Sequence, residues 1–466
     1  MKSDTIAAIA TAVSDSGIGI IRISGENAIE VADRVYRSKN NKKRLLNVKS
    51  HTIHYGFIYD GDVMVDEVMV AVMKEPNTYT RENTVEIDCH GGILVMRKIL
   101  DAVLKNGCRL ADPGEFTRRA FLNGRIDLSR AEAVMDVIHS KNEFALRSSV
   151  RQLKGSVSDK VHSLRKEILH EIAFIESALD DPEHISLEGY AEKLGEKTAR
   201  IYGDIKKLVD SADNGKMLKD GINTVIVGKP NAGKSSLLNI LVGEEKAIVT
   251  SYAGTTRDVL EESIKLHGIG LNMIDTAGIR DTDDVVEKIG VEKARKYAGN
   301  ADLILYVVDA SCQLDENDDQ IMRLIAGKKV IVLLNKTDLE QVVSEADIVK
   351  KMTDVSFDGG VVRVIKTSTK ENTGMDVFED TIKEMFFHGE IAVNDEIYIT
   401  NQRHKEALAE AGESMRMVLN SLADHMPEDF YSIDLMSAYA ALGKIIGEEV
   451  DDDLVNEIFA KFCMGK

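Results

Sequence analysis

The fold of the middle of this chain is decided by the stretch Gly228-Lys-Pro-Asn-Ala-Gly233-Lys234-Ser235. It fits the pattern G-x-x-x-x-G-K-[ST], it follows an apolar run at 224–227, and it precedes a helix-like stretch at 236–241. A glycine turn between a strand and a helix directs backbone N–H groups and the positive end of the helix dipole at a bound anion. In this pattern the lysine contacts the outer phosphates and the serine hydroxyl binds Mg²⁺. The stretch therefore predicts a nucleoside triphosphate site, whose contacts we expect from Asn231, Ala232, Gly233, Lys234, Ser235 and Ser236.

Further motifs follow in the order expected for a guanine nucleotide. Asp275-Thr276-Ala277-Gly278 follows the apolar run at 271–274. Its carboxylate is expected to hold the Mg²⁺ shell through water, and the Gly278 amide to meet the terminal phosphate. Between this motif and the phosphate loop lies Gly254-Thr255-Thr256, where a switch segment with a Mg²⁺-binding threonine belongs. We assign that role to Thr256.

The choice of base rests on Asn335-Lys336-Thr-Asp338, which follows the apolar run at 330–334. The Asp338 carboxylate is expected to accept from both N–H donors on the guanine edge. Adenine lacks this pair of donors, so the carboxylate would stay unpaired at a cost of about 1–3 kcal/mol. Ser368-Thr369 follows a fourth apolar run, where a backbone amide is expected to reach the guanine oxygen. Together these motifs predict a preference for GTP over ATP.

The residue that orients the attacking water is not evident from the motifs. Many GTPases carry a glutamine directly after Gly278, but this chain has Ile279, which has no polar side-chain atom. The candidates in the next turn are Arg280, Asp281, Asp283, Asp284 and Glu287, and the three aspartates also fit a solvated acidic loop. Asn231 has two readings as well: its carbonyl binds a monovalent cation beside the phosphates, or it makes a hydrogen bond within the loop.

Length and charge limit the remaining possibilities. A chain of 466 residues is expected to form about three domains. With 59 basic and 78 acidic residues its formal charge is −19, which excludes a general coat for nucleic acid. A local basic patch stays open at Lys39, Lys42, Lys43 and Arg44, with a solvated loop as the alternative. The sequence has no apolar run of membrane-spanning length, and its four separate cysteines suit a reducing cytosol.

The pattern of apolar residues divides the chain into three kinds of structure. Residues 1–120 mix short strands, expected near 18–24, 68–73 and 84–89, with a helix at 93–105, as in an α+β domain. Residues 121–217 and 386–466 are helical, with apolar stripes that neither segment buries alone. The stripe of the first segment is expected from Val161, Leu164, Ile168, Ile172, Ile175 and Leu179. Residues 218–385 alternate buried-type strands with helices, which predicts a parallel sheet covered on both faces. We expect the two helical segments to pack together, with the α/β P-loop (Ras-like) G domain inserted between them.

The chain resembles the MnmE (TrmE) family of tRNA-modification GTPases over essentially its whole length. Four groups of residues carry the resemblance. They are 4–11 (DTIAAIAT) with 19–25 (GIIRISG), 78–82 (TYTRE) with 89–92 (CHGG), 113–124 (PGEFTRRAFLNG) with 131–134 (AEAV), and 462–466 (FCMGK). The family's layout is also an N-terminal module, a split helical module and an inserted G domain.

The resemblance implies a function beyond GTP hydrolysis. Members of the family bind a one-carbon tetrahydrofolate, in its 5-formyl or 5,10-methylene form, in the N-terminal domain and form homodimers through it. With an FAD- and NADH-dependent partner, MnmG, these cytoplasmic proteins add an aminomethyl-type (carboxymethylaminomethyl) group to carbon 5 of the wobble uridine of certain tRNAs. Their hydrolysis is activated by potassium-dependent dimerisation of G domains.

The resemblance also implies roles for individual residues. The folate contacts fall on Arg22, Glu82, Arg125 and Lys466. The potassium ligands fall on Asn231, Thr250, Tyr252 and Thr255, within a loop 250–256 that also contains Ser251 and Ala253. Glu287 matches the residue that orients water, and Cys463 matches the cysteine required for modification, so these two join Lys234 as expected catalytic residues.

Several positions depart from the family pattern. Arg81 stands where the family commonly has glycine, Tyr252 replaces an aliphatic residue, and Arg125 replaces a lysine. The segment 180–184, Asp-Asp-Pro-Glu-His, differs from the usual Asp-Phe-Pro-Glu-Glu. Two rival functions also stay open: a regulatory switch that only binds partners, and a P-loop protein that uses ATP.

Overall fold

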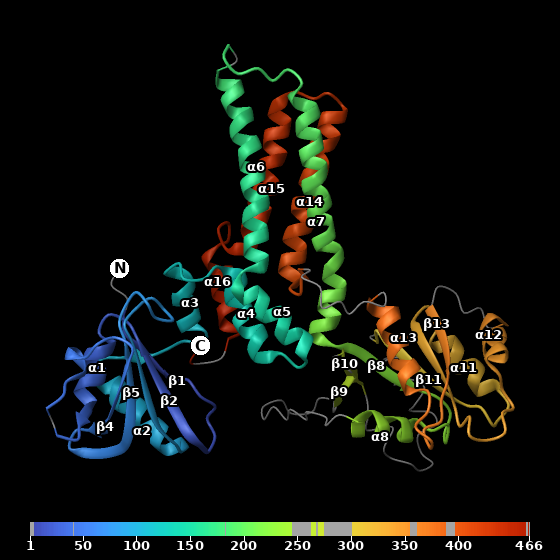
Figure 1. Ribbon diagram of the computed structural model, residues 1–466, viewed down its shortest axis with the longest axis horizontal. Coiled ribbons are helices and arrows are strands. Elements are labelled where there is room, and N and C mark those ends of the chain that lie inside the picture. The colour runs from blue at the N-terminus through green and yellow to red at the C-terminus, as the bar shows by residue number, and fades with distance from the viewer. Residues whose placement is uncertain are drawn as a thin grey trace. The chain divides into compact units, whose positions relative to one another are not determined.

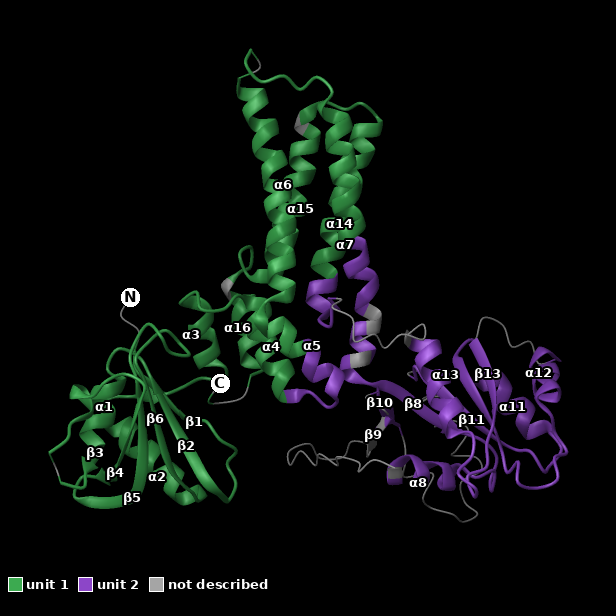
Figure 2. Cartoon of the chain, in the orientation of Figure 1, with its two compact units in different colours: residues 1–138, 149–205, 406–466 green, residues 139–148, 206–405 purple. Residues whose placement is uncertain are grey.

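Figure 1 presents the computed structural model of the protein, which describes residues 4–40, 42–181, 183–244, 262–266, 269–274, 301–354, 361–387, 397–462 and 465. The chain forms two compact units (Figure 2). Unit 1 holds Met1–Ile138, Ser149–Ile205 and Glu406–Lys466, and unit 2 holds His139–Ser148 and Lys206–Lys405. Unit 2 is therefore almost entirely an insertion, in sequence, into unit 1.

The N-terminal part of unit 1 is a seven-stranded sheet in the order β3-β4-β5-β6-β2-β1-β7. Neighbouring strands are antiparallel except β1 and β7, which are parallel. The strands are β1 (Ile6–Ile9), β2 (Ser16–Ser24), β3 (Tyr36–Ser38), β4 (Thr52–Asp60), β5 (Val63–Met73), β6 (Thr84–Gly91) and β7 (Arg109–Leu110). The helices are α1 (Ala28–Val35) and α2 (Ile93–Lys105), with a short 3-10 turn, η1 (Leu45–Asn47).

One face of this sheet is buried against the two helices. Along β5, Val68, Val70 and Val72 are buried in the same core as residues of α1 and α2, whereas Met69 between them is 47% exposed. This alternation places successive side chains on opposite faces. The strands predicted near 18–24, 68–73 and 84–89 and the helix at 93–105 are confirmed, while β3, β4 and α1 were not predicted.

The rest of unit 1 is helical. Its elements, some of which extend into unit 2, are α3 (Glu115–Leu122), α4 (Leu128–His139), α5 (Glu143–Lys154), α6 (Ser156–Asp180), α7 (Tyr190–Asp220), α14 (Gln402–Ala423), α15 (Glu428–Ile446) and α16 (Asp452–Ala460). The predicted stripe of α6 is buried from Val161 to Ile175. The prediction was wrong at Leu179, which is 40% exposed near the end of the helix, one turn beyond the buried stripe.

The two helical stretches pack against each other, as their apolar stripes predict. Helix α6 contacts α15 along its length, and the Ser432 hydroxyl donates to Glu176 at 2.5 Å. The Arg165 guanidinium lies 3.9 Å from the centre of the Tyr439 ring. In this way residues before and after the inserted segment share one helical core.

Unit 2 is built on a six-stranded sheet in the order β13-β12-β11-β8-β10-β9, parallel except for the antiparallel pair β9 and β10. Its strands are β8 (Ile222–Val227), β9 (Glu262–Leu266), β10 (Ile269–Met273), β11 (Leu303–Asp309), β12 (Lys329–Asn335) and β13 (Val361–Lys366). Its helices include α8 (Lys234–Glu244), α11 (Glu316–Leu324), α12 (Glu345–Asp354) and α13 (Met375–Phe387).

Strand β11 shows why its sequence is a continuous apolar run. Leu303, Leu305 and Val307 enter one buried core, and the alternating residues 304, 306 and 308 enter a second core on the other face. Both faces of the sheet are thus covered, as the sequence predicted. Within the described part of the chain, none of the helices combines the length and the apolar character needed to cross a membrane.

Candidate functional site

The phosphate loop connects β8 to α8 and has the backbone that its glycines permit. Gly228 and Gly233 both have positive φ angles, 151° and 105°. A Cβ atom would lie 2.4 Å from the Val307 carbonyl oxygen at Gly228, and 2.1 Å from the Asn335 amide nitrogen at Gly233. Because both contacts are far too close for any side chain, the loop can pass under β11 and β12 only with glycine at these two positions.

The lysine of this loop lies inside the turn. The Lys234 ammonium donates to the carbonyl oxygens of Gly228 and Lys229 at 2.8 and 2.7 Å. Burial lowers the pKa of Lys234, because burial penalises the charged form. A phosphate would restore the favourable environment for that charge. Ser235 and Ser236 occupy the first turn of α8, and Asn231 has a left-handed backbone with φ of 62°.

The opposite end of the site is organised by Asn335 at the end of β12. Its side-chain nitrogen donates to the Ala232 carbonyl at 2.9 Å, and its side-chain oxygen accepts from the Thr369 amide at 3.0 Å. The Ser368 hydroxyl donates to Asp338 at 2.7 Å. This hydrogen bond is the main reason why the pKa of Asp338 is below its usual value. One asparagine thus joins the phosphate loop to the two segments expected to recognise the base.

The neighbouring Lys336 makes an ion pair with Asp309 at the end of β11, at 2.6 Å. Burial alone raises the pKa of Asp309, but the bonds from Lys336 and Ser311 outweigh burial and hold this pKa below its usual range. Lys336 also has a positive φ of 62°. This pair orients the chain that leads to Asp338.

A further contact braces the phosphate loop from outside. The Lys229 ammonium lies 2.7 Å from Asp318 and 3.1 Å from Asp315 at the start of α11. Asp318 is 1% exposed and also accepts from the Tyr306 hydroxyl at 2.7 Å. Burial alone lowers the pKa of Lys229, but these carboxylates raise it above its usual value. This brace is not evident from the sequence, because no spacing rule connects Lys229 to an aspartate 89 residues away.

The remaining predicted nucleotide, catalytic and folate-binding residues fall outside the described residues. They are Thr250, Ser251, Tyr252, Ala253, Gly254, Thr255, Thr256, Asp275, Thr276, Ala277, Gly278, Glu287, Cys463 and Lys466. The residues that the structure brings together in unit 2 are those of the phosphate loop with Asn335, Lys336, Asp338, Ser368 and Thr369.

A second group of predicted residues meets in unit 1. The Arg22 guanidinium lies 5.6 Å from the centre of the Tyr79 ring, and the Arg125 guanidinium lies 4.4 Å from that ring. Arg22 also pairs with Glu86 at 2.7 Å and donates to the Gly465 carbonyl at 3.0 Å. Beside Tyr79 and Arg125 lies a cavity of about 380 Å³, lined otherwise mainly by apolar residues of α4. Arg22 and Arg125 therefore flank one aromatic ring.

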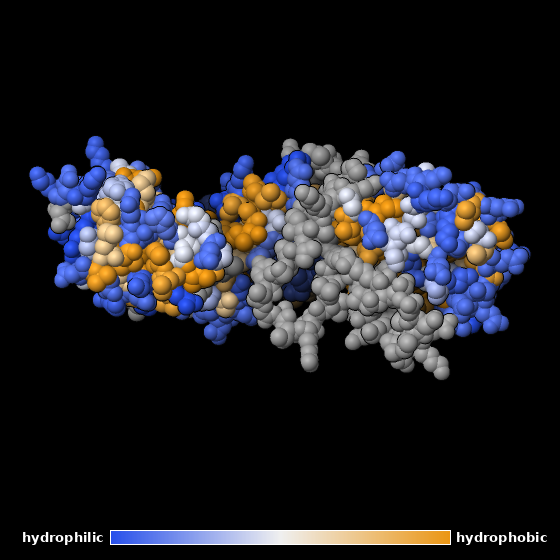
Figure 3. All heavy atoms as spheres, turned by 90° about the horizontal axis from the view of Figure 1, so that it is seen from below, coloured by the Kyte–Doolittle hydropathy of each residue, from blue (hydrophilic) through white to orange (hydrophobic). Residues whose placement is uncertain are grey.

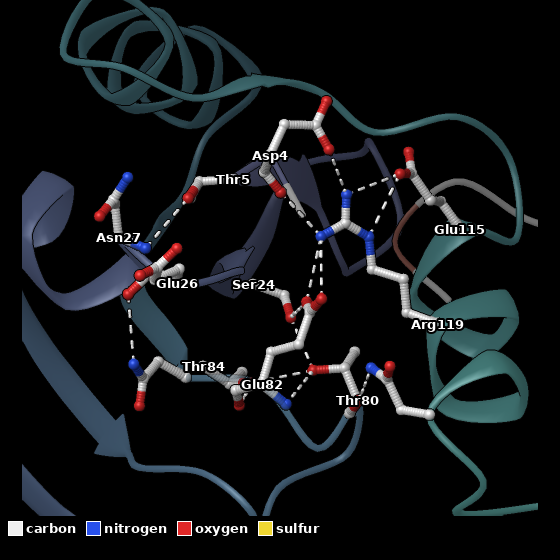
Figure 4. A network of polar contacts seen from close by, with 12 residues as sticks. Asp4, Thr5, Ser24, Glu26, Asn27, Thr80, Glu82, Thr84, Glu115 and Arg119 are labelled. Carbon is white, nitrogen blue, oxygen red and sulfur yellow. Dashed lines mark hydrogen bonds and ion pairs between the residues drawn. The ribbon is translucent and has the colours of Figure 1, made fainter. Parts of the chain in front are cut away.

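Glu82, the third predicted residue here, is 9% exposed and belongs to the buried network in Figure 4. Its carboxylate accepts from Ser24 at 2.8 Å and from Arg119 at 3.1 Å. Arg119 extends the network to Glu115 and Asp4, at 2.9 and 2.8 Å. A buried charge of this kind needs such partners. The sequence analysis did not select Arg119, although its spacing of four residues from Glu115 is a usable signal for an ion pair on one helix.

Comparison with known proteins identifies relatives of the whole chain. A family model described as the MnmE helical domain matches residues 128–463, and another described as the GTP-binding protein TrmE N-terminus matches residues 5–125. The chain is 56% identical over 466 residues to the tRNA modification GTPase MnmE of Lachnoclostridium phytofermentans, with 100% of both chains covered. It is 47% identical to that of Alkaliphilus oremlandii and 48% to that of Clostridioides difficile, with 99% of each chain covered.

The chain is also similar to a solved structure, the G domain of the T. maritima FeoB iron transporter. The match has 24% sequence identity and a TM-score of 0.26, and it includes 36% of this chain and 98% of the FeoB chain. The family matches span the N-terminal sheet, both helical stretches and the inserted sheet. Because these matches and the full-length identities agree, the chain belongs to the MnmE (TrmE) family of tRNA modification GTPases.

Proposed function

We propose that this chain binds and hydrolyses GTP and takes part in the modification of tRNA. The observation that carries the proposal is the position of Asn335, which bonds to Ala232 in the phosphate loop and to Thr369 in the base-recognition segment. A single side chain therefore fixes the distance between the phosphate end and the base end of the site. The names of the full-length relatives support the same activity.

In this proposal each part of the site has a separate task. Lys234 exchanges its two carbonyl partners for phosphate oxygens, and Asp338, already held by Ser368, accepts from the guanine edge. Ser235 at the start of α8 would hold Mg²⁺ together with Thr256, with Asp275 in the outer shell. Bound Mg²⁺ supplies neutralisation of the charge that develops on the phosphates. Glu287 would orient the attacking water.

A potassium ion would bind beside the phosphates in the proposed catalysis. The left-handed backbone of Asn231 turns the loop at the position from which its side-chain carbonyl would act. Thr250, Tyr252 and Thr255 would complete the ligand set when two G domains meet. If potassium takes part in this way, replacing K⁺ by Na⁺ lowers the rate of GTP turnover, and equal rates in the two salts exclude the role.

The unit 1 site would bind a one-carbon tetrahydrofolate. Arg22, Arg125 and Tyr79 offer two cations and a ring, which suit an aromatic ligand with an acidic tail. Arg22 also donates to the Gly465 carbonyl, which places Gly465 beside the same residues. We propose that Cys463 and Lys466, close to Gly465 in sequence, act at this site. With an FAD-dependent, MnmG-like partner, the chain would use the one-carbon unit to build the aminomethyl-type group on carbon 5 of the wobble uridine.

Self-association in a homodimer is part of the proposal. Ile53, Tyr55 and Met69 are exposed on the face of the N-terminal sheet opposite its helices. Apolar patches are also visible between polar ones on the surface in Figure 3. Exposed apolar side chains on a sheet face suit contact with a second chain.

The choice of nucleotide tests the first part of the proposal. GTP is expected to displace a fluorescent guanosine diphosphate at far lower concentration than ATP. Asp338→Asn should weaken GTP binding by about 1–3 kcal/mol, since it removes the acceptor of the guanine N–H groups. Equal competition by ATP in the unaltered chain would exclude a guanine site.

Removal of the C-terminal residues tests the second part. A chain that ends before Cys463 should keep its GTP turnover but fail to restore wobble-uridine modification in cells that lack their own copy. If tRNA from such cells keeps the modification, the chain is a GTP-dependent switch that acts only through partners.

A further inference from the structure

The longest interval without an acidic residue in this chain lies between Asp33 and Asp60. It contains seven cations, which are Arg34, Arg37, Lys39, Lys42, Lys43, Arg44 and Lys49. The rest of the chain is so acidic that its formal charge is −19. If the chain contacts RNA at all, the contact needs a local surface where this negative charge does not dominate.

Four of these lysines lie in the segment that connects the edge strand β3 to β4 in the N-terminal sheet. The Lys43 amide donates to the Ser38 hydroxyl at 3.1 Å, which closes the turn that follows β3 and carries Lys39 and Lys42. We call Lys39, Lys42, Lys43 and Lys49 the lysine loop.

Lys49 lies at the other end of this connecting segment, three residues before β4. The Thr52 hydroxyl donates to the Lys49 carbonyl at 2.6 Å and also contacts His54 at 2.8 Å. Burial lowers the pKa of His54, and the positive charge of Lys43 lowers it further. The Lys49 carbonyl is thus bonded to the same threonine that contacts His54, and the charge of Lys43 acts on that histidine.

The lysine loop differs from the other cations of this interval in its partners. Arg34 pairs with Glu30 at 3.8 Å, Arg37 with Asp62 at 3.7 Å, and Arg44 with Asp33 at 2.5 Å. The four lysines are exposed, and none has an ion-pair partner among the residues that the structure describes. Four unpaired like charges in one loop repel one another, and an array of phosphates would remove that repulsion.

Protection of a sheet edge is the rival explanation, because lysines often prevent edge strands from pairing with other chains. Strand β3 is an edge strand, but it comprises only Tyr36–Ser38. The lysines follow the strand rather than lying on it. Edge protection therefore leaves this cluster unexplained.

We propose that the lysine loop is a contact surface for the phosphate backbone of RNA, and that it holds the tRNA on which the chain acts. The inference rests on the proposed function in tRNA modification. Lysines without aromatic or amide partners recognise phosphates as point charges, so the contact adds affinity and does not read sequence.

The test is the salt dependence of tRNA binding by the full chain. Lys39, Lys42, Lys43 and Lys49 are all replaced by Gln, and binding of an unmodified tRNA transcript is measured between 50 and 200 mM salt. Each phosphate contact contributes about 0.7–0.9 to the slope of log affinity against log salt, so the slope should fall by roughly 3. Replacing the same four by Arg should preserve it.

A matched control removes the same charge elsewhere. Lys166, Lys193, Lys206 and Lys207 are exposed lysines of α6 and α7, and their replacement by Gln should leave most of the slope in place. An equal loss in this control, an unchanged slope in the lysine-loop variant, or no tRNA binding by the unaltered chain overturns the proposal. Increased aggregation with normal tRNA binding would show that the lysines protect the sheet edge instead.

Two further measurements separate this inference from the proposed function. The lysine-loop variant should hydrolyse GTP at the unaltered rate, because the loop belongs to unit 1 and the nucleotide residues to unit 2. If the unaltered chain restores wobble modification but the lysine-loop variant still binds tRNA normally, the lysine loop is not the RNA contact, and the proposed function stands. If the unaltered chain restores none, the proposed function itself fails.

Discussion

Arg81 has a backbone conformation that glycine adopts more readily. Its φ is 61°, in the left-handed region, and its guanidinium donates to the Asn123 carbonyl at 2.9 Å. A non-glycine residue in this region costs roughly 1–2 kcal/mol, whereas one net hydrogen bond returns about 0.5–1.5 kcal/mol. The two effects nearly cancel, so arginine is tolerated at this position.

Two substitutions at this position separate strain from bonding. Arg81→Ala removes the hydrogen bond and keeps the strain, whereas Arg81→Gly removes both. We expect the glycine variant to be more stable than the alanine variant by about 1 kcal/mol, and close to the unaltered chain. Urea unfolding of the three proteins measures the difference. Equal stability of the two variants would mean that the left-handed backbone carries no strain.

At the scale of the element, α11 supports the phosphate loop through its first turn. Asp315 caps the helix by accepting from the amides of Asn317 and Asp318. Asp315 and Asp318 also both pair with the Lys229 ammonium, so this one positive charge connects the start of the helix to the loop. A loop fixed in this way loses less freedom when phosphate binds.

Loss of the Lys229 charge should therefore weaken nucleotide binding. Lys229→Met keeps the length of the side chain and leaves Asp318 with fewer partners, and we expect affinity for guanosine diphosphate to fall about tenfold, or roughly 1.4 kcal/mol. Lys351→Met, which removes a partly exposed pair with Asp319 on the same helix, should change affinity by less than about 1 kcal/mol. Lys229→Arg should restore most of the loss. Lower stability with normal affinity in Lys229→Met would limit Lys229 to a structural role.

These elements also show how far sequence reasoning reaches. The strands of unit 2 were predictable, because two-sided burial makes each of them an uninterrupted apolar run such as 303–308. The bonds of Asn335 to Ala232 and Thr369 agree with the predicted order of motifs. The Lys229 brace was not predictable from spacing, since its partners meet only after the chain folds. In the Arg119 network only the pair with Glu115 has a helical spacing that could have indicated it. The roles of Thr256 and Glu287 stay predictions.

The contact of α3 with β1 and β7 should depend on pH. Burial alone raises the pKa of Glu115, but hydrogen bonds from Arg109, the Asp112 amide and Arg119 outweigh it and lower this pKa below its usual 4.5. A carboxyl group whose pKa is lower in the folded state stabilises the fold above the unfolded pKa. This stability is lost as pH falls through the folded pKa.

Glu115→Gln should therefore destabilise this region most at neutral pH. We expect a difference of about 2 kcal/mol at pH 7, from the loss of hydrogen bonds to a charged group. The difference should shrink steadily below about pH 4.5 as the unaltered Glu115 takes up a proton. Hydrogen exchange of β1 amides, compared between the two proteins at each pH, measures it. A gap that stays constant down to pH 3 would mean that the charge of Glu115 does not contribute.

At the scale of the whole molecule, Gly465, late in the sequence, contacts strands of the N-terminal sheet of unit 1. Arg22 on β2 donates to the Gly465 carbonyl, across 443 positions of sequence. Gly465 has a positive φ of 89°, and a Cβ atom there would lie 2.5 Å from the Ile9 carbonyl oxygen. Gly465 thus lies directly against β1, at a position that only glycine fits.

Displacement of the C-terminal tail should impair the proposed folate site and leave the nucleotide site intact. Gly465→Ala forces the tail away from β1, and Arg22→Gln removes its hydrogen bond, so we expect each to weaken binding of 5-formyltetrahydrofolate at least about tenfold, or roughly 1.4 kcal/mol. GTP turnover should not change, because Asn335 and the phosphate loop lie in unit 2. Arg37→Gln, which removes a cation from the Tyr59 ring in the same unit, serves as the control. If Gly465→Ala binds the folate normally while Arg22→Gln does not, Arg22 contacts the ligand directly and the tail has no part in binding.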